Sequence, residues 1–270
     1  MATAKWLGTA SLELEHDGKV LLIDPHLSRP DKWRTFTRPL APDADKIGAY
    51  LAGLEGEVLG IIVTHSHSDH LVDTPYIARR LGIPVWGNES TDTLLRLSDL
   101  PGCARVLAGG ETFEIGPFTV EAIRTRHGNV AFGKVPFPGR IPSNVQPPLR
   151  VWHYRHGEPP LLLYITAGGR TIFHQGTANL IDNLLPVRQV GSAWVCVSGH
   201  GYTPDFVPRL LRRVRPEKMI PFHFEDFSRP LAADTPFLPG ADPHAFGRKV
   251  QAVAPEVKIV VPQPYERIPF

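Results

Sequence analysis

The 270-residue sequence contains little cysteine, little methionine and no marked excess of either charge. Of its two cysteines, Cys103 and Cys196, the second lies in an apolar run that is typical of a buried strand, and we expect both thiols to be reduced. The chain carries 29 Lys and Arg residues against 27 Asp and Glu residues. This near balance lacks the clustered positive charge on which binding to nucleic acids depends, so no nucleic-acid partner is predicted.

Long apolar runs are absent as well, and no segment of the sequence is apolar for long enough to span a bilayer. Residues 1–5 lead directly into an alternating segment, without the charged and apolar regions of an export signal. We therefore expect a cytoplasmic protein with no stable insertion into a membrane. The sequence also lacks a Gly-x-Ser-x-Gly elbow, a phosphate-binding loop and a dinucleotide fingerprint, which argues against a serine nucleophile, phosphoryl transfer and hydride transfer.

Helix-like and strand-like segments alternate towards both ends of the chain, whereas its middle is rich in strands. Hydrophobic periodicity predicts helices over residues 47–54, 76–81 and 91–97, near 181–185, and over 204–213 and 243–254. It predicts strands over residues 11–15, 19–24, 58–63, 84–86, 111–115, 118–124, 149–154, 161–166, 170–173, 194–197, 219–221 and 257–261. Because helices flank a strand-rich centre and no linker divides the chain, we expect a single domain over residues 1–270.

Two stretches, residues 27–43 and 131–148, show no pattern of secondary structure. Long loops of this kind in a compact domain usually cover a functional site or are disordered. Aromatic residues such as Trp33 and Phe137 favour order, since disordered segments seldom carry them. We expect these stretches to form the wall or lid of an active site, although surface loops that only pack on the body would show the same pattern.

A cluster of ligand-type side chains directly follows the predicted strand at residues 58–63. It contains His65, His67, Asp69 and His70 within the sequence Thr-His-Ser-His-Ser-Asp-His. Core packing does not require such a cluster, whereas imidazole and carboxylate groups are common ligands of metal ions. Residues two apart face the same way in extended backbone, so His65 and His67 can bind one ion. Asp69 and His70 follow where the chain turns, and can reach a second ion beside it.

This cluster resembles the His-x-His-x-Asp-His signature of the metallo-β-lactamase superfamily. The resemblance implies an α/β fold built as a four-layer αββα sandwich, in which two mixed β-sheets are flanked by helices. Gly8 and Asp24 match earlier features of the family, and Asp24 would be a carboxylate that orients a metal ligand. His127, at the end of a predicted strand, matches the family's next ligand, and His223 matches its last.

The resemblance covers nearly the whole chain and implies two groups of metal ligands. One group consists of His65, His67 and His127, and the other of Asp69, His70 and His223. The sequence around His223 is similar to the branch of ascorbate-6-phosphate lactonases and lipid phosphodiesterases. One position departs from the family pattern, because Gly176 or Thr177 stands where many members have a metal-bridging aspartate in a Gly-Asp-Thr turn. A dizinc subgroup of β-lactamases also lacks this aspartate, so the resemblance implies one or two bound ions.

Several other side chains are candidates for contact with the substrate or with the ligands. His174 and His200 lie at strand ends beside the predicted site, and His26 lies next to Asp24. The predicted catalytic residues are Asp69 and His200. The further predicted contacts to ligands or substrate are Asp24, His26, His174 and Thr177. The histidines predicted to lie at the surface are His16, His153, His156 and His244.

The sequence predicts a metal-dependent hydrolase of small molecules that uses a metal-activated hydroxide, which Asp69 can orient. Imidazole ligands with one carboxylate favour zinc, although manganese and iron are compatible with them. The favoured substrate is a lactone, ester or amide. A phosphodiesterase acting on phospholipids or nucleotides is an alternative, because two metal ions also stabilise displacement at phosphorus. A metal-binding protein without turnover is disfavoured, since a decayed site has no reason to keep a second set of ligands; the oligomeric state is left open.

Overall fold

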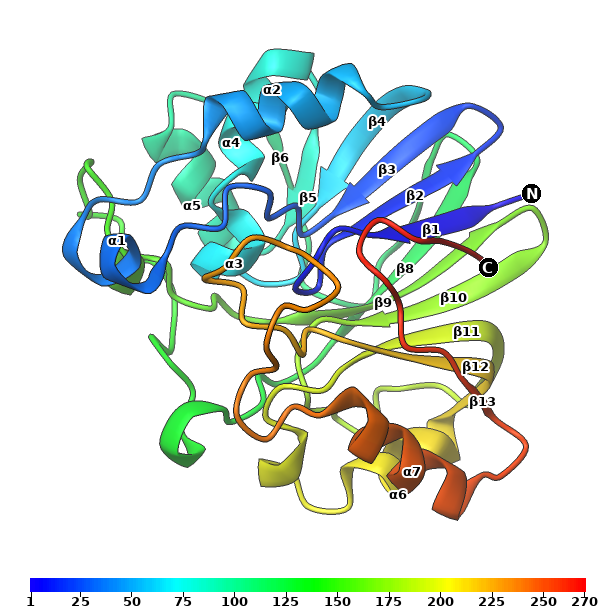
Figure 1. The fold of residues 1–270 in the computed structure, drawn as a ribbon. Helices are drawn as coiled ribbons and strands as arrows, with labels where there is room; N and C mark the ends of the chain where they lie inside the picture. Colours follow the sequence, from blue (N-terminus) through cyan, green and yellow to red (C-terminus); the bar gives the residue numbers. More distant parts are fainter.

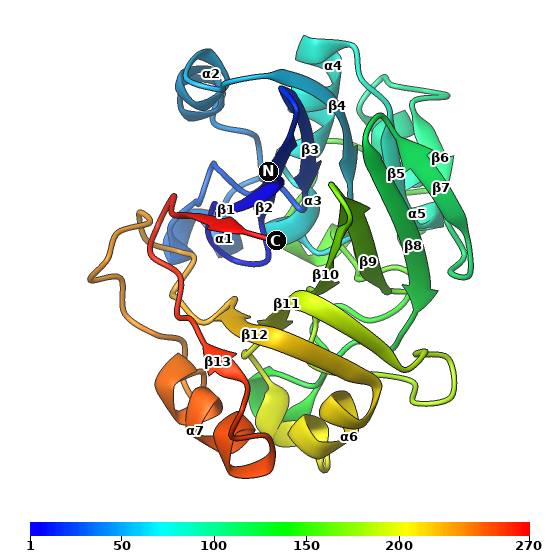
Figure 2. The same cartoon turned by 90° about the vertical axis from the view of Figure 1, so that its right-hand side faces the viewer.

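The computed structural model describes residues 1–270, apart from the side chain of Ala131. Two seven-stranded sheets face each other, and helices cover the outer face of each sheet (Figures 1 and 2). This arrangement confirms the predicted αββα sandwich with two mixed sheets. The predicted single domain is consistent with a hydrophobic core whose buried residues come from both sheets.

The first sheet has the strand order β14-β1-β2-β3-β4-β5-β6, antiparallel from β14 to β3 and parallel from β3 to β6. Its strands are β1 (Thr3–Trp6), β2 (Leu12–His16), β3 (Lys19–Ile23), β4 (Glu57–Ile62), β5 (Val85–Gly87), β6 (Ala104–Val106) and β14 (Arg267–Pro269). The carboxyl ends of β3 and β4 lie side by side because these strands are parallel. The chain segments that follow these two strands are therefore brought together at one edge of the sandwich.

The second sheet has the order β13-β12-β11-β10-β9-β8-β7, antiparallel from β7 to β10 and parallel from β10 to β13. Its strands are β7 (Thr112–Ile115), β8 (Phe118–Arg124), β9 (Leu161–Ala167), β10 (Arg170–Gln175), β11 (Arg188–Cys196), β12 (Val214–Phe222) and β13 (Lys258–Ile259). The loops after β8, β10 and β12 reach the same edge as those after β3 and β4, and this edge carries the site described below.

The helices lie on the outside, and apart from α1, which buries no residue, they pack with buried side chains against the body of the protein. They are α1 (Lys32–Thr37), α2 (Ala44–Ala52), α3 (Ser68–Leu71), α4 (Thr74–Leu81), α5 (Glu89–Leu97), α6 (Phe206–Arg213) and α7 (Pro243–Val253). In α6, Phe206 and Leu210 are buried, whereas Arg212 lies on the outer side, as expected for an amphipathic helix. None of the helices in the described chain is both long and apolar enough to cross a lipid bilayer.

Large apolar side chains fill the space between the sheets. Trp6, Phe118, Trp194 and Phe222 are all almost completely buried there. Burial of one such side chain stabilises the fold by about 1.5–3 kcal/mol relative to exposure. The sheets are therefore a rigid support for the loops at their edges.

Most of the predicted elements are confirmed, and the errors lie where the chain is short of regular structure. The hairpin of β2 and β3 forms, with Asp17 and Gly18 in its turn. The strand predicted over residues 149–154 is wrong, because residues Val151–His153 form a 3-10 turn whose apolar side chains pack under the helices of the first sheet. The helix predicted near residues 181–185 is also wrong. It is reduced to a single turn directly before Pro186, which leaves too few residues to extend a helix.

Candidate metal centre

The predicted ligands gather in two groups at the edge of the sandwich. Residues 64–67 run in extended or irregular backbone after β4, and α3 starts at Ser68, so the ligands of the histidine cluster point in different directions from a short segment. His65, His67 and His127 form the first triad, and Asp69, His70 and His223 form the second triad. Within each triad the potential ligand atoms all lie within 4.8 Å of one another. The rings of His65 and His70 are 3.8 Å apart between centroids, so the triads are adjacent.

The nitrogen spacing in the first triad fits a tetrahedral metal site. The Nε2 atoms of His65 and His127 lie 3.2 Å apart. Two nitrogens bound tetrahedrally to one zinc ion at about 2.0–2.1 Å would be about 3.3 Å apart. The observed spacing therefore fits an ion between them.

Hydrogen bonds to carbonyl oxygens fix the tautomers of two histidines in the first triad. Nε2 of His67 donates to the carbonyl oxygen of Pro136 at 2.8 Å, and Nδ1 of His127 donates to that of Gly128 at 2.7 Å. A carbonyl oxygen only accepts, so these nitrogens carry the protons and Nδ1 of His67 and Nε2 of His127 keep their lone pairs. Burial lowers the pKa of His67 to about 4 and holds that of His127 well below its ordinary value. Both side chains are therefore neutral and ready to bind a cation.

Asp24 connects the two triads. Its carboxylate is fully buried and accepts hydrogen bonds from Thr64 N at 2.7 Å, from Thr64 Oγ1 at 2.5 Å and from His70 Nδ1 at 2.8 Å. Thr64 Oγ1 lies 3.3 Å from His65 Nδ1 and can accept its proton while it donates to Asp24. Asp24 thus contacts His70 directly and His65 through Thr64, and its role in orienting metal ligands stays a prediction.

The second triad converges on the carboxylate of Asp69. Its Oδ2 atom lies 3.2 Å from Nε2 of His223 and 3.6 Å from Nε2 of His70. Burial alone would raise the pKa of Asp69, but His70 and His223 more than offset this effect and hold the pKa well below its ordinary value. Burial lowers the pKa of His70, while Asp24 and Asp69 together raise it above the ordinary value. The second triad therefore contains an ionised carboxylate, which the first triad lacks.

A sequence profile named Beta-lactamase superfamily domain matches residues 3–223, which span all six ligands. The chain belongs to the metallo-β-lactamase superfamily. It is 29% identical over 285 residues to the UPF0173 metal-dependent hydrolase of Cupriavidus necator, a match that covers 100% of this chain and 86% of the relative. It is 23% identical over 269 residues to the UPF0173 metal-dependent hydrolase of Methanopyrus kandleri, with 97% and 98% of the two chains covered.

Solved structures show the same fold at low sequence identity. The metallo hydrolase Igni18 of Ignicoccus hospitalis superimposes with a TM-score of 0.64 at 19% identity, over 99% of this chain and 97% of that protein. CmlA, a diiron β-hydroxylase from Streptomyces venezuelae, gives a TM-score of 0.61 at 15% identity, over 100% of this chain and 54% of that protein. These likenesses confirm the fold. The lactonase and lipid phosphodiesterase branch suggested by the sequence stays a prediction.

His223 is held in place by a buried network that sequence patterns did not indicate. Its backbone adopts a positive φ of 56°, and its N–H donates to Thr9 O at 3.0 Å. Thr9 N in turn donates to Glu225 Oε1 at 2.6 Å, and the same oxygen accepts from Arg29 Nη1 at 2.9 Å. Gly8 suits this position because its φ of 93° strains other residues, and a Cβ atom on it would lie 2.3 Å from Arg29 Nη1. Of the residues in this network, only Gly8 was indicated by the sequence, because it matches a feature of the family pattern.

Two of the other candidate histidines point away from the triads. His174 is buried, and its Nε2 donates to Ala10 O at 2.9 Å, in the turn between β1 and β2. His200 donates from Nδ1 to Val197 O at 2.8 Å, and its Nε2 lies 3.0 Å from Lys249 Nζ, on α7. A catalytic role for His200 is a prediction that these contacts do not support.

Thr177 lies beside the first triad, where its hydroxyl oxygen accepts from Gly128 N at 2.8 Å. The neighbouring Gly176 has no room for a side chain, since a Cβ atom on it would lie 2.8 Å from Thr64 Oγ1 and 3.2 Å from Asp24 Oδ2. Of the two residues that the sequence left open for the missing bridging aspartate, only Thr177 therefore has space for a carboxylate side chain.

His156 does not lie at the surface, which corrects the prediction from the sequence. It is buried, with its ring stacked on His127 at 5.6 Å and edge-on to His67 at 6.0 Å between centroids. Its Nδ1 donates to Gly157 O, and its Nε2 accepts from Gly139 N at 3.3 Å. The prediction was wrong because Ser66 N binds the carbonyl oxygen of His156, which draws this segment under the histidine cluster.

The two irregular stretches border the two triads. Residues 136–139, here called the strap, contact the first triad through Pro136 O, and two further backbone bonds join the strap to residues 156–157. The stretch 27–43 is ordered and contains α1. Its start is anchored by Asp73, which directly follows the segment of the second triad and accepts from Leu27 N at 2.6 Å and Ser28 N at 2.8 Å.

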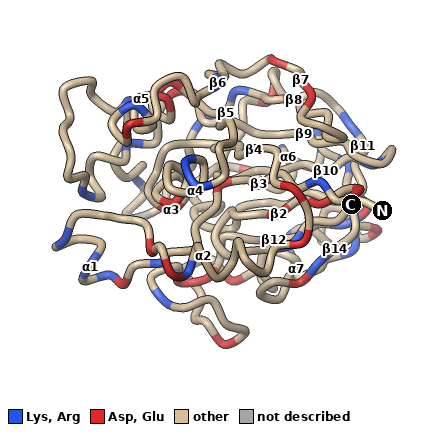
Figure 3. Tube along the Cα trace, turned by 90° about the horizontal axis from the view of Figure 1, so that it is seen from above, with Lys and Arg blue, Asp and Glu red and all other residues tan. Residues whose placement is uncertain are grey.

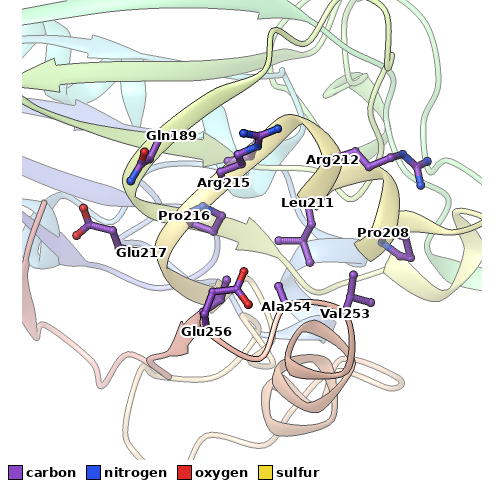
Figure 4. Close-up of a pocket in the computed structure, with 12 residues that line it drawn as sticks. Gln189, Pro208, Leu211, Arg212, Arg215, Pro216, Glu217, Val253, Ala254 and Glu256 are labelled. Carbon is purple, nitrogen blue, oxygen red and sulfur yellow. The ribbon is translucent and has the colours of Figure 1, made fainter.

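A separate hollow of about 670 Å³ lies far from the triads (Figure 4). It is formed where α6 and α7 meet the start of β12, and Leu211, Arg215 and Val253 are among its lining residues. The second triad instead receives His223 directly after the opposite end of β12. The hollow is therefore not part of the candidate metal centre.

Proposed function

We propose that the protein is a metal-dependent hydrolase and that its substrate is a lactone, an ester or an amide. One observation carries this proposal: two adjacent triads present converging ligand atoms, and the nitrogens of His67, His127 and His70 that face away from them are tied to acceptors. A histidine with a purely structural role would not require that the lone pair of its second ring nitrogen stay unpaired. The names of the relatives, which are metal-dependent hydrolases, support the reaction class.

The first triad would hold one metal ion and the second triad another. Three imidazoles, or two imidazoles and a carboxylate, suit zinc, although the diiron relative CmlA shows that this fold also accommodates iron. A bound zinc ion lowers the pKa of its water to about 7 and polarises a substrate oxygen, which supplies a nucleophile at neutral pH. Thr177 adds no charge between the triads, so we expect the second site to bind its ion more weakly.

The chain's own residues orient the reactants. Asp69 is ionised, and its carboxylate can accept a hydrogen bond from the attacking water and so direct a lone pair at the carbonyl carbon. The strap and the stretch 27–43 border the triads and would limit the access of bulk water. Acidic and basic residues are interspersed along the chain trace in Figure 3, which fits a small-molecule substrate better than a polyanion.

A substrate panel with metal analysis tests this proposal. Protein purified without added metal is assayed with γ-butyrolactone, an aryl ester, an anilide and bis(p-nitrophenyl) phosphate, after elemental analysis. We expect turnover of a carbonyl substrate. Chelation should abolish this turnover and added zinc should restore it. Asp69→Asn should lower the turnover without changing the fold. Turnover of the phosphodiester alone would instead assign a phosphodiesterase, and full metal content without any turnover would assign a metal-binding protein.

A further inference from the structure

His26 is a buried histidine without a partner. It follows Asp24 and Pro25 after β3, and its side chain is only 2% exposed. Neither Nδ1 nor Nε2 has a hydrogen-bond partner among the residues that the structure describes. Buried polar atoms are almost always paired, because an unpaired one costs about 1–3 kcal/mol. An unpaired imidazole beside an active site therefore indicates that something else supplies the partner.

The surroundings of His26 place it on the side of the second triad. The charged groups that act on it are Asp69, Arg29, His70 and His223, three of which form that triad. Phe227 packs edge-on against both His26 and His223, with centroid distances of 6.3 and 5.8 Å. His26 does not join the described ligand atoms that lie within 4.8 Å of one another, so it lies just outside the ligand set.

No neighbouring side chain lies within hydrogen-bond distance of His26, although Nδ1 of His223 and Oε2 of Glu225 are also unpaired among the described residues. The guanidinium of Arg29 donates to Glu225 Oε1, to Arg229 O at 2.7 Å and to Asp226 O at 3.4 Å. Phe227 offers no polar atom. The missing partner of His26 therefore comes from outside the described chain, as a water molecule, a metal ion or the substrate.

The two sides of the site differ in the groups that they leave for a substrate. On the side of the first triad, the strap carbonyl of Pro136 and the amide of Gly139 are already bound to His67 and His156. Asp69, in the second triad, is the proposed acceptor for the attacking water. The polar atom of an ester or lactone that still lacks a partner is its leaving oxygen. The unpaired imidazole of His26 lies on the side of the second triad, where it can supply that partner.

We propose that His26 donates a hydrogen bond to the leaving oxygen of the substrate and so selects substrates with a polar atom at that position. This inference rests on the proposed hydrolysis of a carbonyl substrate. A buried neutral imidazole has one N–H donor and one lone pair, and it can therefore bind either the ester oxygen before cleavage or the hydroxyl group after it. Apolar compounds would leave His26 unpaired and bind less tightly.

Butyrate and 4-hydroxybutyrate test this directly, because they differ only in the oxygen that leaves when γ-butyrolactone is opened. Their binding to the zinc-loaded protein is measured by calorimetry in the wild type, in His26→Phe and in His26→Gln. We expect the wild type to prefer 4-hydroxybutyrate by about fivefold to tenfold, the equivalent of one hydrogen bond. His26→Phe should abolish the preference, and His26→Gln, which keeps a donor, should restore part of it.

Two further measurements separate this role from a structural one. Zinc content should be the same in all three proteins, and His26→Phe should unfold at the same denaturant concentration as the wild type or at a higher one, since it removes unpaired polar atoms. A preference that persists in His26→Phe, its absence from the wild type, or loss of bound zinc in the variant would each overturn the assignment. If the wild type neither opens γ-butyrolactone nor binds either acid, the proposed function itself fails.

Discussion

The two halves of the candidate metal centre are built from similar side chains but differ in how completely these are hydrogen-bonded. On the first side, His67 and His127 are tied to backbone carbonyls, and the outer histidine, His156, has partners on both nitrogens. On the second side, Nδ1 of His223 and both nitrogens of His26 have no partner within the described residues. The first half is therefore preorganised for a metal ion, and the second half retains groups for a ligand that arrives later.

Charge separates the halves as well. The first triad consists of imidazoles alone, and burial keeps them neutral, whereas the second triad contains the ionised Asp69. Asp24 contacts both, through His70 directly and through the hydroxyl of Thr64 towards His65. The halves are thus expected to bind metal with different affinities while sharing one orienting carboxylate.

The largest expected effect comes from removing one ligand in each half. His67→Ala should lose the more tightly bound ion and, with it, all measurable hydrolysis. The variant would hold this ion with two imidazoles and a water molecule in place of three imidazoles, which lowers the metal affinity greatly. His70→Ala should keep about one ion per chain and lose the other. Elemental analysis after gel filtration measures both, with His244→Ala, an exposed histidine on α7, as the control. Full metal occupancy in His67→Ala would contradict the assignment of the first triad.

Asp24→Asn should weaken both sites, and the second more than the first. An amide NH₂ in place of Oδ2 would face Nδ1 of His70 and force the proton onto Nε2, which is the atom beside Asp69. Loss of such an orienting partner typically costs about 10–100-fold in metal affinity. His65 is affected only through the hydroxyl of Thr64. Competition with a chromophoric chelator measures both constants, and Asp73→Asn, a buried carboxylate outside the ligand set, is the matched control. Equal losses at both sites would show that the halves are not independent.

The two outer histidines should respond in opposite ways to replacement by phenylalanine. Burial lowers the pKa of His26 to about 3, against the opposing charge of Asp69. The unfolded chain therefore binds this proton near pH 6.5 and the folded chain only near pH 3, so stability is lost as the pH falls between these values. In metal-free protein, His26→Phe should match the wild type at pH 7.5 and exceed it by about 2 kcal/mol at pH 5.

His156→Phe should be less stable than the wild type at both pH values, by about 1–3 kcal/mol, because it leaves the amide of Gly139 without its acceptor. Urea unfolding in the presence of a chelator measures both variants. A destabilised His26→Phe at neutral pH would show that His26 does have a partner within the protein.

The sequence was sufficient for the sandwich and for locating the six side chains that gather in the two triads, because this information is local. Strand and helix periods extend over short segments, and the histidine cluster, His127 and His223 each directly follow a strand that the pattern identifies. The environment of His156 depends instead on backbone bonds to Ser66 and to the strap, from distant parts of the chain. Arg29 and Glu225 are 196 residues apart, and no periodicity relates them.

Errors of secondary structure had the same origin. Residues 149–154 have apolar side chains suited to a strand, but Leu149 pairs with Leu40 N through its carbonyl oxygen, and Val151 and Tyr154 turn inward under the helices. Short edge strands such as β6 and β14 carry too few residues for a period to be read. Tertiary contacts decide the conformation of such segments, and the sequence of the segment alone does not contain them.

The smallest expected effect concerns the position of the missing bridging aspartate. Thr177→Asp should tighten the second site by about tenfold, equivalent to about 1.4 kcal/mol, because a carboxylate adds negative charge between two dications. One carboxylate oxygen can still accept from Gly128 N, as the hydroxyl does now, so the turn beside His127 is kept. Thr177→Asn has nearly the same shape without the charge and should leave the affinity unchanged. Titration of metal-free protein with zinc, with hydrolysis followed in parallel, should show in the wild type a filled first site and a second that fills as activity rises. Full activity at one equivalent of zinc, with no further binding, would show that the second triad does not hold a catalytic ion. If Thr177→Asn tightened the second site as much as Thr177→Asp, the shape of the side chain rather than its charge would set the zinc affinity of this site.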